Sequence, residues 1–184
     1  MEIISLDTFT KTYLVPKYIS VFFCVLFLIS CQKEVTLQFS DRTFSSEKNA
    51  IISVVIPEAQ GNSLAAKNIN KVLEQFACTA LNIDTSKAPR FLIEESSKQF
   101  DASYASFKKQ ISNELSLELP IWEANIDGEL TFINENVISI AMNSSINTGA
   151  ANDNLKIKFF NFNPFTGQSV PIEDSVNDLS LIHI

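Results

Sequence analysis

The sequence predicts one α+β domain, in which an N-terminal strand and two amphipathic helices pack on an antiparallel meander sheet. Three observations predict this fold class: a β-branched run at 51–56, two later segments with apolar residues at helical spacing, and alternating apolar and polar residues after Pro120. This order of elements is typical of domains whose helices cover one face of a sheet. We assign the domain to residues 50–178.

The first strand and the first helix have clear signals. The run 51–56 is β-branched except at Ser53, which is typical of a buried strand, and we expect Pro57 to end it. Ser63 follows Gly61 and Asn62 and is the predicted N-cap of a helix. The stripe that predicts this helix consists of Leu64, Ile69, Val72, Leu73, Phe76, Ala77, Ala80 and Leu81.

A second helix is predicted from about Ser97 to Leu117. Its stripe has steps of four and three residues and consists of Phe100, Tyr104, Phe107, Ile111 and Leu115. The aromatic stripe has two interpretations, a platform for a ligand or an ordinary core face. The helical spacing favours the core face. Cys78, late in the first helix, is likewise expected to be a buried core residue rather than a reactive thiol.

Strands follow from Trp122, where Trp122, Ala124 and Ile126 alternate with polar residues. The sequence Asn134-Glu135-Asn136 predicts a hairpin between strands at 130–133 and 137–142. A further strand is expected at 155–162, where Lys156 and Lys158 alternate with Ile157 and Phe159. The turn at 163–167 contains Pro and Gly, and a return strand is expected to begin at 170–172.

Composition excludes two classes of function. The chain of 184 residues contains 14 Lys and Arg and 21 Asp and Glu, a net charge of −7, and it has no basic run longer than Lys108-Lys109. Neutralising phosphates requires clustered cations, so nucleic-acid binding is not expected. The 4 glycines lie far apart, whereas a phosphate-binding loop needs several at fixed spacing. No nucleotide and no other cofactor is expected.

Residues 1–30 are predicted to be a lipoprotein signal peptide. The uncharged apolar run 18–30 is shorter than the roughly 20 residues that span a bilayer. It ends in Leu28-Ile29-Ser30-Cys31, which resembles a bacterial lipobox, so we expect lipidation of Cys31 and a tether over 31–49. The predicted location is the bacterial cell envelope, at the outer membrane or periplasmic face. The alternative is an uncleaved anchor with an incidental cysteine.

Residues 179–184 are expected to be foreign to the protein. Their sequence is the peptide that the end of a sequencing-library transposon encodes in one reading frame. On this interpretation the natural chain continues beyond Asp178, and His183, the only histidine, carries no function. The alternative is a natural apolar tail.

No catalytic or metal-binding constellation is predicted. The available carboxylates are Glu94-Glu95, Asp127 and Glu173-Asp174. Paired carboxylates perform glycosidic chemistry, so a wall-modifying hydrolase or an accessory subunit is one alternative. Solvated surface charge is the favoured interpretation, because adjacent acids on a strand point to opposite faces. No spacing typical of a calcium loop is present.

The order of motifs resembles a domain of unknown function. This envelope domain is shared by lysozyme-sensing anti-sigma factors, by the non-catalytic N-terminal part of a peptidoglycan deacetylase, and by many lipoproteins. The matching residues are Ile56-Pro57, Gly61, Asn68-Ile69-Asn70, Trp122, Asn136-Val137-Ile138-Ser139-Ile140, Thr148-Gly149-Ala150-Ala151, Asn161-Phe162-Asn163-Pro164-Phe165-Thr166-Gly167 and Glu173-Asp174.

The resemblance implies a non-catalytic binding or sensing module. Its ligand would be cell-wall glycan (peptidoglycan) or a basic secreted wall-degrading protein such as lysozyme. The family loop of the type Thr-Gly-Gly-Ala-His reads Thr148-Gly149-Ala150-Ala151-Asn152 here, so the titrating histidine is replaced by an amide. Thr148, Gly149 and Asn152 are the candidate binding loop; the alternative is a loop that only turns a hairpin. A passive envelope component that pairs through a sheet edge is the remaining alternative.

Overall fold

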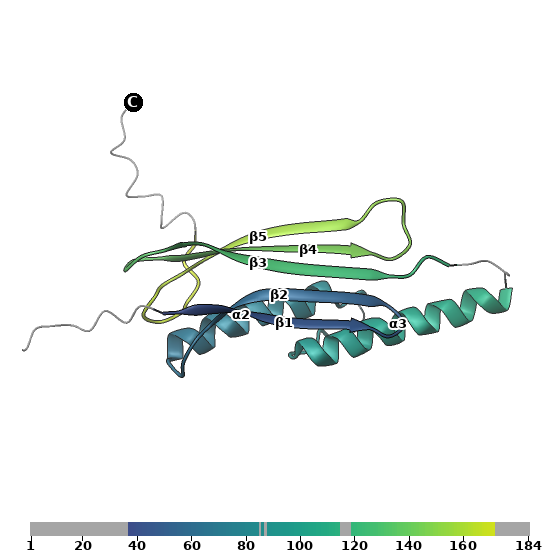
Figure 1. The fold of residues 1–184 in the computed structure, drawn as a ribbon, viewed down its shortest axis with the longest axis horizontal. Helices are drawn as coiled ribbons and strands as arrows, with labels where there is room; N and C mark the ends of the chain where they lie inside the picture. Colours follow the sequence, from purple (N-terminus) through teal and green to yellow (C-terminus); the bar gives the residue numbers. More distant parts are fainter. Residues whose placement is uncertain (1–36, 85, 87, 115–118, 172–184) are drawn as a thin grey trace, which may run out of the picture. The chain divides into compact units, whose positions relative to one another are not determined.

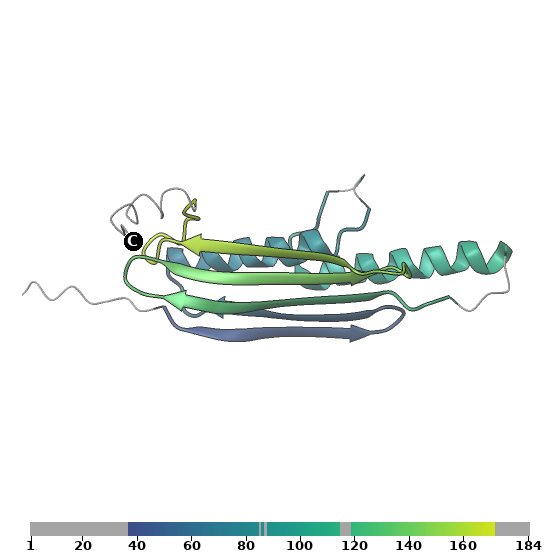
Figure 2. The ribbon, with the colours of Figure 1, turned by 90° about the horizontal axis from the view of Figure 1, so that it is seen from above.

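The computed structural model describes residues 37–84, 86, 88–114 and 119–171. In this part of the chain, five strands form one sheet in the order β1-β2-β3-β4-β5, and helices α2 and α3 lie along one face of it (Figures 1 and 2). The predicted α+β class is confirmed. The predicted signal peptide, Cys31 and the tail 179–184 lie outside the described residues.

Strand β1 (Phe39–Glu47) lies inside the range 31–49 that the sequence assigned to a tether, so the fold begins earlier than predicted. It pairs antiparallel with β2 (Ile51–Ala59) over its whole length. As an edge strand it half-buries side chains such as Arg42 and Phe44 on one face and exposes the other. Such a strand contains too few apolar residues to be recognised in the sequence from an alternation of apolar and polar positions.

Strand β2 continues past Pro57, which was wrongly expected to end it. The pairing of β2 with β3 stops at Val55, and beyond that residue β2 pairs only with β1. Proline is tolerated where a strand has lost one neighbour, because its missing N–H then leaves no gap in a ladder.

The two helices form the connection between β2 and β3 (Glu123–Ile133), which are parallel neighbours in the sheet. Parallel strands need a long crossover, and the 63 residues between Ala59 and Glu123 supply it. The sheet is therefore mixed, and the predicted antiparallel meander holds for β3, β4 (Ile138–Asn147) and β5 (Asn154–Phe162). The β3–β4 hairpin turns at Asn134 as predicted, with the Asn134 N–H donating to Val137 O at 3.0 Å.

Helix α2 (Leu64–Ala80) has the predicted position and the predicted cap, since the Ser63 side chain accepts a hydrogen bond from Ala66 N. Its buried face packs on the sheet, and Cys78 is fully buried as expected. Burial raises the pKa of the Cys78 thiol. The apolar layer between helices and strands includes Ile52, Val54, Ile69, Leu73, Phe76, Ile126, Ile138, Ile140, Met142, Phe160 and Phe162.

Helix α3 (Ile93–Glu114) begins one turn before the predicted start at Ser97; Leu115 and Leu117 lie outside the described residues. Its aromatic stripe is a core face, as favoured from the spacing, because Phe100 and Tyr104 are buried. Their rings lie 5.8 Å and 5.4 Å from that of Trp122, measured between centroids. The stripe therefore anchors α3 to the residue that precedes β3, rather than facing a ligand.

Side chains from the helices fasten the ends of the strands. The Asp101 carboxylate on α3 accepts hydrogen bonds from Asn49 N and Asn49 Nδ2, both at 2.7 Å, and from Ala50 N at 3.0 Å. On α2, Asn70 Oδ1 accepts from Ala59 N at 2.7 Å, and Asn70 Nδ2 donates to Ala59 O. These polar contacts fix the position of both helices relative to the β1–β2 hairpin.

Candidate functional site

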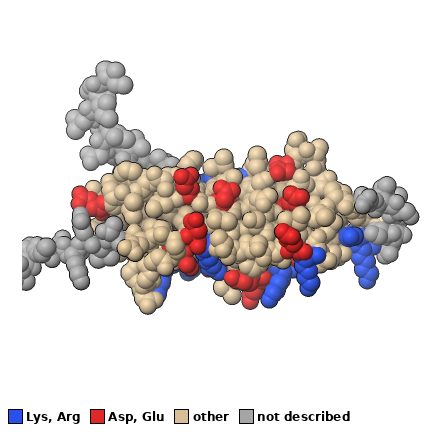
Figure 3. All heavy atoms as spheres, in the orientation of Figure 1, with Lys and Arg blue, Asp and Glu red and all other residues tan. Residues whose placement is uncertain are grey.

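The face of the sheet opposite the helices, called here the open sheet face, carries one sign of charge. Its carboxylates are all exposed: Asp41, Glu47, Glu123, Asp127 and Glu129. The three cations of the described strands (Arg42, Lys156 and Lys158) occupy the alternate, helix-side positions. In Figure 3, acidic side chains spread over the strand side of the drawn face, and basic ones gather toward the helix side.

The open sheet face is apolar along β5. Leu155, Ile157 and Phe159 are 68%, 66% and 64% exposed. Hydropathy alone would place these residues inward and the intervening lysines outward, but the structure has the reverse. The reason is at the end of the strand, where Phe160 and Phe162 are buried and set the phase of the alternation.

A groove runs between α2 and β5 on the helix side. It consists of two hollows, of about 240 Å³ and 340 Å³, that share Thr79 and Lys156 as lining residues. The residues that define this α2–β5 groove are Phe76, Thr79, Thr148, Lys156, Lys158 and Phe160. No Asp or Glu is among the described residues that line either hollow.

The two lysines of the groove lie against aromatic rings rather than carboxylates. Lys158 Nζ is 4.6 Å from the centroid of Phe160, and Lys156 Nζ is 6.0 Å from that of Phe76. Cation–π contacts orient an ammonium group without neutralising its charge. Within the described ranges, the ion pairs that the structure contains are those of Arg42 with Glu74 and Glu94, so both groove lysines retain a free positive charge.

The predicted binding loop follows β4, and its three residues have different environments. Thr148 lines the α2–β5 groove. The Gly149 N–H donates to Asn147 Oδ1 at 2.8 Å; its φ is +84°, and a Cβ there would lie 2.8 Å from Pro120 Cγ. Asn152 is exposed and lines none of the hollows described. The role of this loop in binding stays a prediction, with Thr148 as the residue that faces a hollow.

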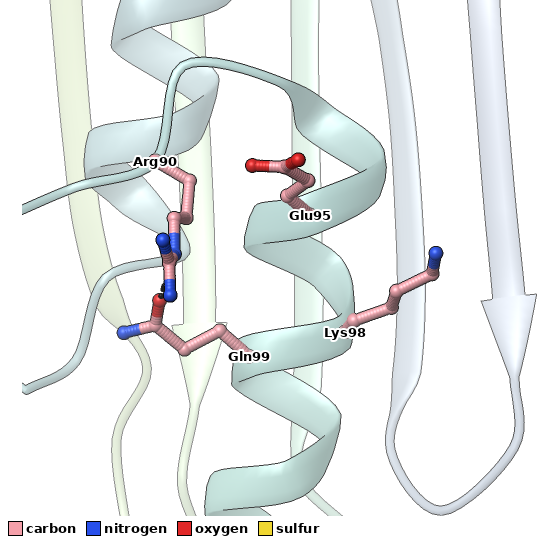
Figure 4. A pocket seen from close by; sticks show the side chains of 4 residues that line it. All are labelled: Arg90, Glu95, Lys98 and Gln99. Carbon is pink, nitrogen blue, oxygen red and sulfur yellow. Dashed lines mark hydrogen bonds between the residues drawn. The ribbon is translucent and has the colours of Figure 1, made fainter.

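Two other hollows are less suited to a ligand. One, of about 580 Å³, is open and is lined by Arg90, Glu95, Lys98 and Gln99 near the start of α3 (Figure 4). There Arg90 Nε donates to Gln99 Oε1 at 3.3 Å, while Lys98 extends away from both side chains. The other, of about 500 Å³, lies beside Arg42, whose guanidinium is already paired with Glu74 at 3.2 Å.

The carboxylates considered for hydrolytic chemistry do not converge in the described part of the chain. Glu94 accepts a hydrogen bond from Arg42 at 3.2 Å, Glu95 lines the hollow of Figure 4, and Asp127 is on the open sheet face. Glu173 and Asp174 lie outside the described residues. A hydrogen bond from its own backbone N–H lowers the pKa of the Glu94 carboxyl, and the nearby Arg42 lowers it as well. Burial acts in the opposite direction but does not outweigh them.

No group of three or more His, Cys, Asp or Glu side chains among the described residues could hold a metal ion. Over the same residues, no helix is both long and apolar enough to cross a membrane.

Sequence reasoning missed Lys156 and Lys158 as candidate site residues. The available signal was two lysines at alternate positions of an otherwise apolar strand, which places both ammonium groups on one face. Their position over a groove could not be read from the sequence, because it depends on where α2 crosses β5.

Several features that carried the family resemblance have structural roles. Asn70 binds the end of β2, and Asn68 Nδ2 donates to Thr166 O at 2.8 Å. Asn163 Oδ1 accepts from the backbone N–H groups of Phe165 and Thr166, which closes the turn after β5. These motif residues therefore stabilise the fold through hydrogen bonds between its elements.

The solved structures that match this chain have low sequence identity to it. A member of the DUF3298 family from Bacteroides fragilis superposes with a TM-score of 0.61 at 11% identity, covering 80% of this chain and 67% of that one. A DUF3298 family protein from Pseudomonas aeruginosa gives a TM-score of 0.39 at 12% identity, covering 76% of this chain and 55% of the other. No curated protein sequence matches.

A family model matches the chain over residues 44–154, more than half of its length, and is described as deacetylase PdaC. The matched region begins within β1, contains β2, both helices, β3 and β4, and ends at the first residue of β5. The family match supports a non-catalytic accessory module of uncertain role. The chain belongs to this deacetylase PdaC family, which confirms the predicted resemblance.

Proposed function

We propose that this protein is a lipid-anchored module of the bacterial cell envelope that binds a basic secreted wall-degrading protein such as lysozyme. Lipid on Cys31 would hold it to the membrane, at the outer membrane or periplasmic face. The observation that carries the proposal is the open sheet face, on which five exposed carboxylates occur without a strand lysine or arginine.

Charge segregation of this kind favours encounter with a cationic protein. Opposite potentials raise the association rate and orient the partner, and the effect falls as salt screens it. The exposed apolar border of β5 adds the non-polar contact area that a stable interface needs. A basic protein that meets this face would find charge at its centre and apolar side chains along one edge.

Retention of lysozyme by the full chain at low salt tests the proposal. The double variant Glu123→Gln/Glu129→Gln removes two charges from the open sheet face and should weaken lysozyme binding about fivefold to tenfold. The matched control, Glu95→Gln/Glu135→Gln, removes two exposed charges from a helix and a hairpin turn and should change binding less than twofold. Equal losses in both variants, or no retention of lysozyme by the unaltered chain, would contradict the proposal.

The lipid anchor has a separate test. Replacing Cys31 by Ser removes the thiol that would carry the lipid, so the protein should leave the membrane fraction of expressing cells. The control is Cys78→Ser, which keeps Cys31 and should leave the protein with the membranes. A Cys31→Ser protein that stays in the membrane fraction would indicate an uncleaved anchor instead.

Cell-wall glycan is the second candidate ligand. The observation that favours it is the α2–β5 groove, because its hydroxyl, amide and ammonium groups are those that bind sugars and their acidic substituents.

A further inference from the structure

We infer that the α2–β5 groove is a binding site for a carboxylate-bearing glycan. The inference deepens the second ligand of the proposed function and does not depend on the open sheet face. It begins from charge: in a chain with a net charge of −7, this groove has two lysines and no acidic lining residue.

The lysines are arranged for an extended anion. Lys156 and Lys158 are two positions apart on β5, so their Cα atoms are separated by about 7 Å along one face of the strand. Neither ammonium group forms an ion pair with a carboxylate within the described residues. The contacts with the rings of Phe76 and Phe160 hold both groups over the groove. Two fixed positive charges in a row suit a polymer with repeated carboxylates better than a single small anion.

The remaining lining favours sugar over an acidic peptide. Hydroxyl and amide groups of Gln75, Thr79, Thr148 and Asn154 accompany the lysines, and both donate and accept hydrogen bonds. An extended peptide would be held by main-chain hydrogen bonds to a sheet edge, whereas this groove presents the side-chain face of β5. Strand addition at the edge of β5, the last strand of the sheet, would therefore place a peptide beside the lining side chains of the groove rather than over them.

The two ends of the groove differ in what they would bind. One hollow lies at the C-terminal end of α2, where the helix dipole supplies partial negative charge, and is lined by Thr79, Asn82 and Thr148. That end favours neutral hydroxyl donors. The carboxylate belongs beside Lys156 and Lys158, so the ligand would place its acidic group on β5 and its uncharged sugars toward the β4–β5 loop.

Titration of the detergent-solubilised full chain with oligogalacturonate, a soluble carboxylated glycan, tests this site. The double variant Lys156→Gln/Lys158→Gln should bind about tenfold more weakly, since two charge-assisted hydrogen bonds are lost from an exposed groove. The control Lys67→Gln/Lys71→Gln makes the same change of charge on exposed α2 positions outside the groove and should change affinity less than twofold. Thr79→Trp should abolish binding without changing charge, because Thr79 lines both hollows.

Competing ligands distinguish an acidic glycan from a neutral glycan and from an acidic peptide. Neutral chito-oligosaccharide should bind at least tenfold more weakly than oligogalacturonate, and so should polyglutamate of matched charge. Equal binding of polyglutamate would overturn the glycan assignment, and equal losses in the two lysine pairs would reduce the site to general electrostatics. Circular dichroism and urea unfolding confirm that each variant is folded. Lysozyme retention should be unchanged in Lys156→Gln/Lys158→Gln, so failure of the groove leaves the result for the open sheet face standing.

Discussion

The two faces of the sheet are built from the same strands but differ in every property that determines their use. The covered face is apolar and β-branched or aromatic, and its cations lie at the margin, where they meet the helices. The open sheet face is polar and acidic, and its most exposed large apolar side chains lie along β5. Because successive side chains point to opposite faces, a shift of one residue in any strand would exchange these properties.

This difference separates the residues that stabilise the fold from the residues that are exposed for binding. Stability comes from one face, so the other is free to carry like charges that would be unfavourable if they were buried. The acidic face and the basic groove are thereby kept on opposite sides of the sheet. Two ligands of opposite charge could be bound at the same time without competing.

The largest expected effect compares two phenylalanines of β5 that point to opposite faces. Phe162 is fully buried, so Phe162→Ala should lower the free energy of unfolding by about 3–5 kcal/mol through lost burial and a cavity. Phe159→Ala, on the open sheet face, should lower it by less than about 1 kcal/mol. Urea unfolding at neutral pH measures both, and similar losses would show that Phe159 is covered in solution.

Asp101 tests whether the helices need their polar contacts with the β1–β2 hairpin. Burial opposes ionisation of Asp101, but hydrogen bonds from Ala50 and Asn49 outweigh it and leave its pKa below the ordinary value. Asp101→Asn should cost about 1–3 kcal/mol at neutral pH, because two backbone donors lose a charged acceptor.

The pH dependence of this contribution has a definite sign. A lowered folded pKa means that the stabilisation is present above the unfolded value of about 3.9 and disappears as pH falls through the folded pKa. The stability difference between the unaltered chain and Asp101→Asn should therefore be constant from pH 5 to 7 and shrink below about pH 4. A difference that grows at acid pH would contradict the hydrogen-bonding account.

A smaller effect is expected from Arg42, the strand cation at the other margin of the covered face. Burial opposes its charge, yet the nearby Glu74 and Glu94 raise its pKa. Both ion pairs are partly exposed, so Arg42→Ala should cost only about 0.5–1 kcal/mol and less in high salt. Unfolding curves at low and high ionic strength measure this difference, with Arg90→Ala as the control. A loss of unfolding free energy that does not change with salt would indicate that Arg42 stabilises the fold by packing of its side-chain stem.

The smallest effect is expected on the open sheet face itself. Glu123→Gln/Glu129→Gln should change the free energy of unfolding by less than about 0.5 kcal/mol, since both side chains are exposed and no ion pair holds them in the described part of the chain. The same variant is expected to weaken lysozyme binding. A large loss of stability would show that the open sheet face also contributes to folding stability. The double variant could then not be used to test lysozyme binding.

Elements with strong periodic signals were predictable from the sequence. Helix α2 was found with its Ser63 cap, and the β3–β4 hairpin with its asparagine turn, because both signals are local. Strand β1 was missed because its stability comes from pairing with β2, which no local pattern reports. The parallel pairing of β2 and β3 was missed for the same reason, since its paired residues, such as Ile51 and Glu123, are 72 positions apart in the sequence.

The candidate surfaces were less predictable than the fold. The resemblance predicts a candidate binding loop at Thr148, but it does not predict the lysines that line the same groove. Whether Lys156 faces solvent or a helix depends on the phase that Phe160 and Phe162 impose on β5. Charge composition indicated an acidic protein, and only the tertiary structure separated that charge into an acidic face and a basic groove.

The turn after β5 has a consequence for the order in which the domain is completed. Gly167 has a φ of +67°, and a Cβ there would lie 2.3 Å from Ala65 O, so this turn sits directly on the first turn of α2. Asn68 completes the contact through Thr166 O. Because synthesis runs from the N-terminus, the chain contains α2 long before it contains the segment that covers the start of this helix. Until residue 167 has been added, the N-terminal end of that helix lacks this cover, so the domain can close only after the turn that follows β5 has been made.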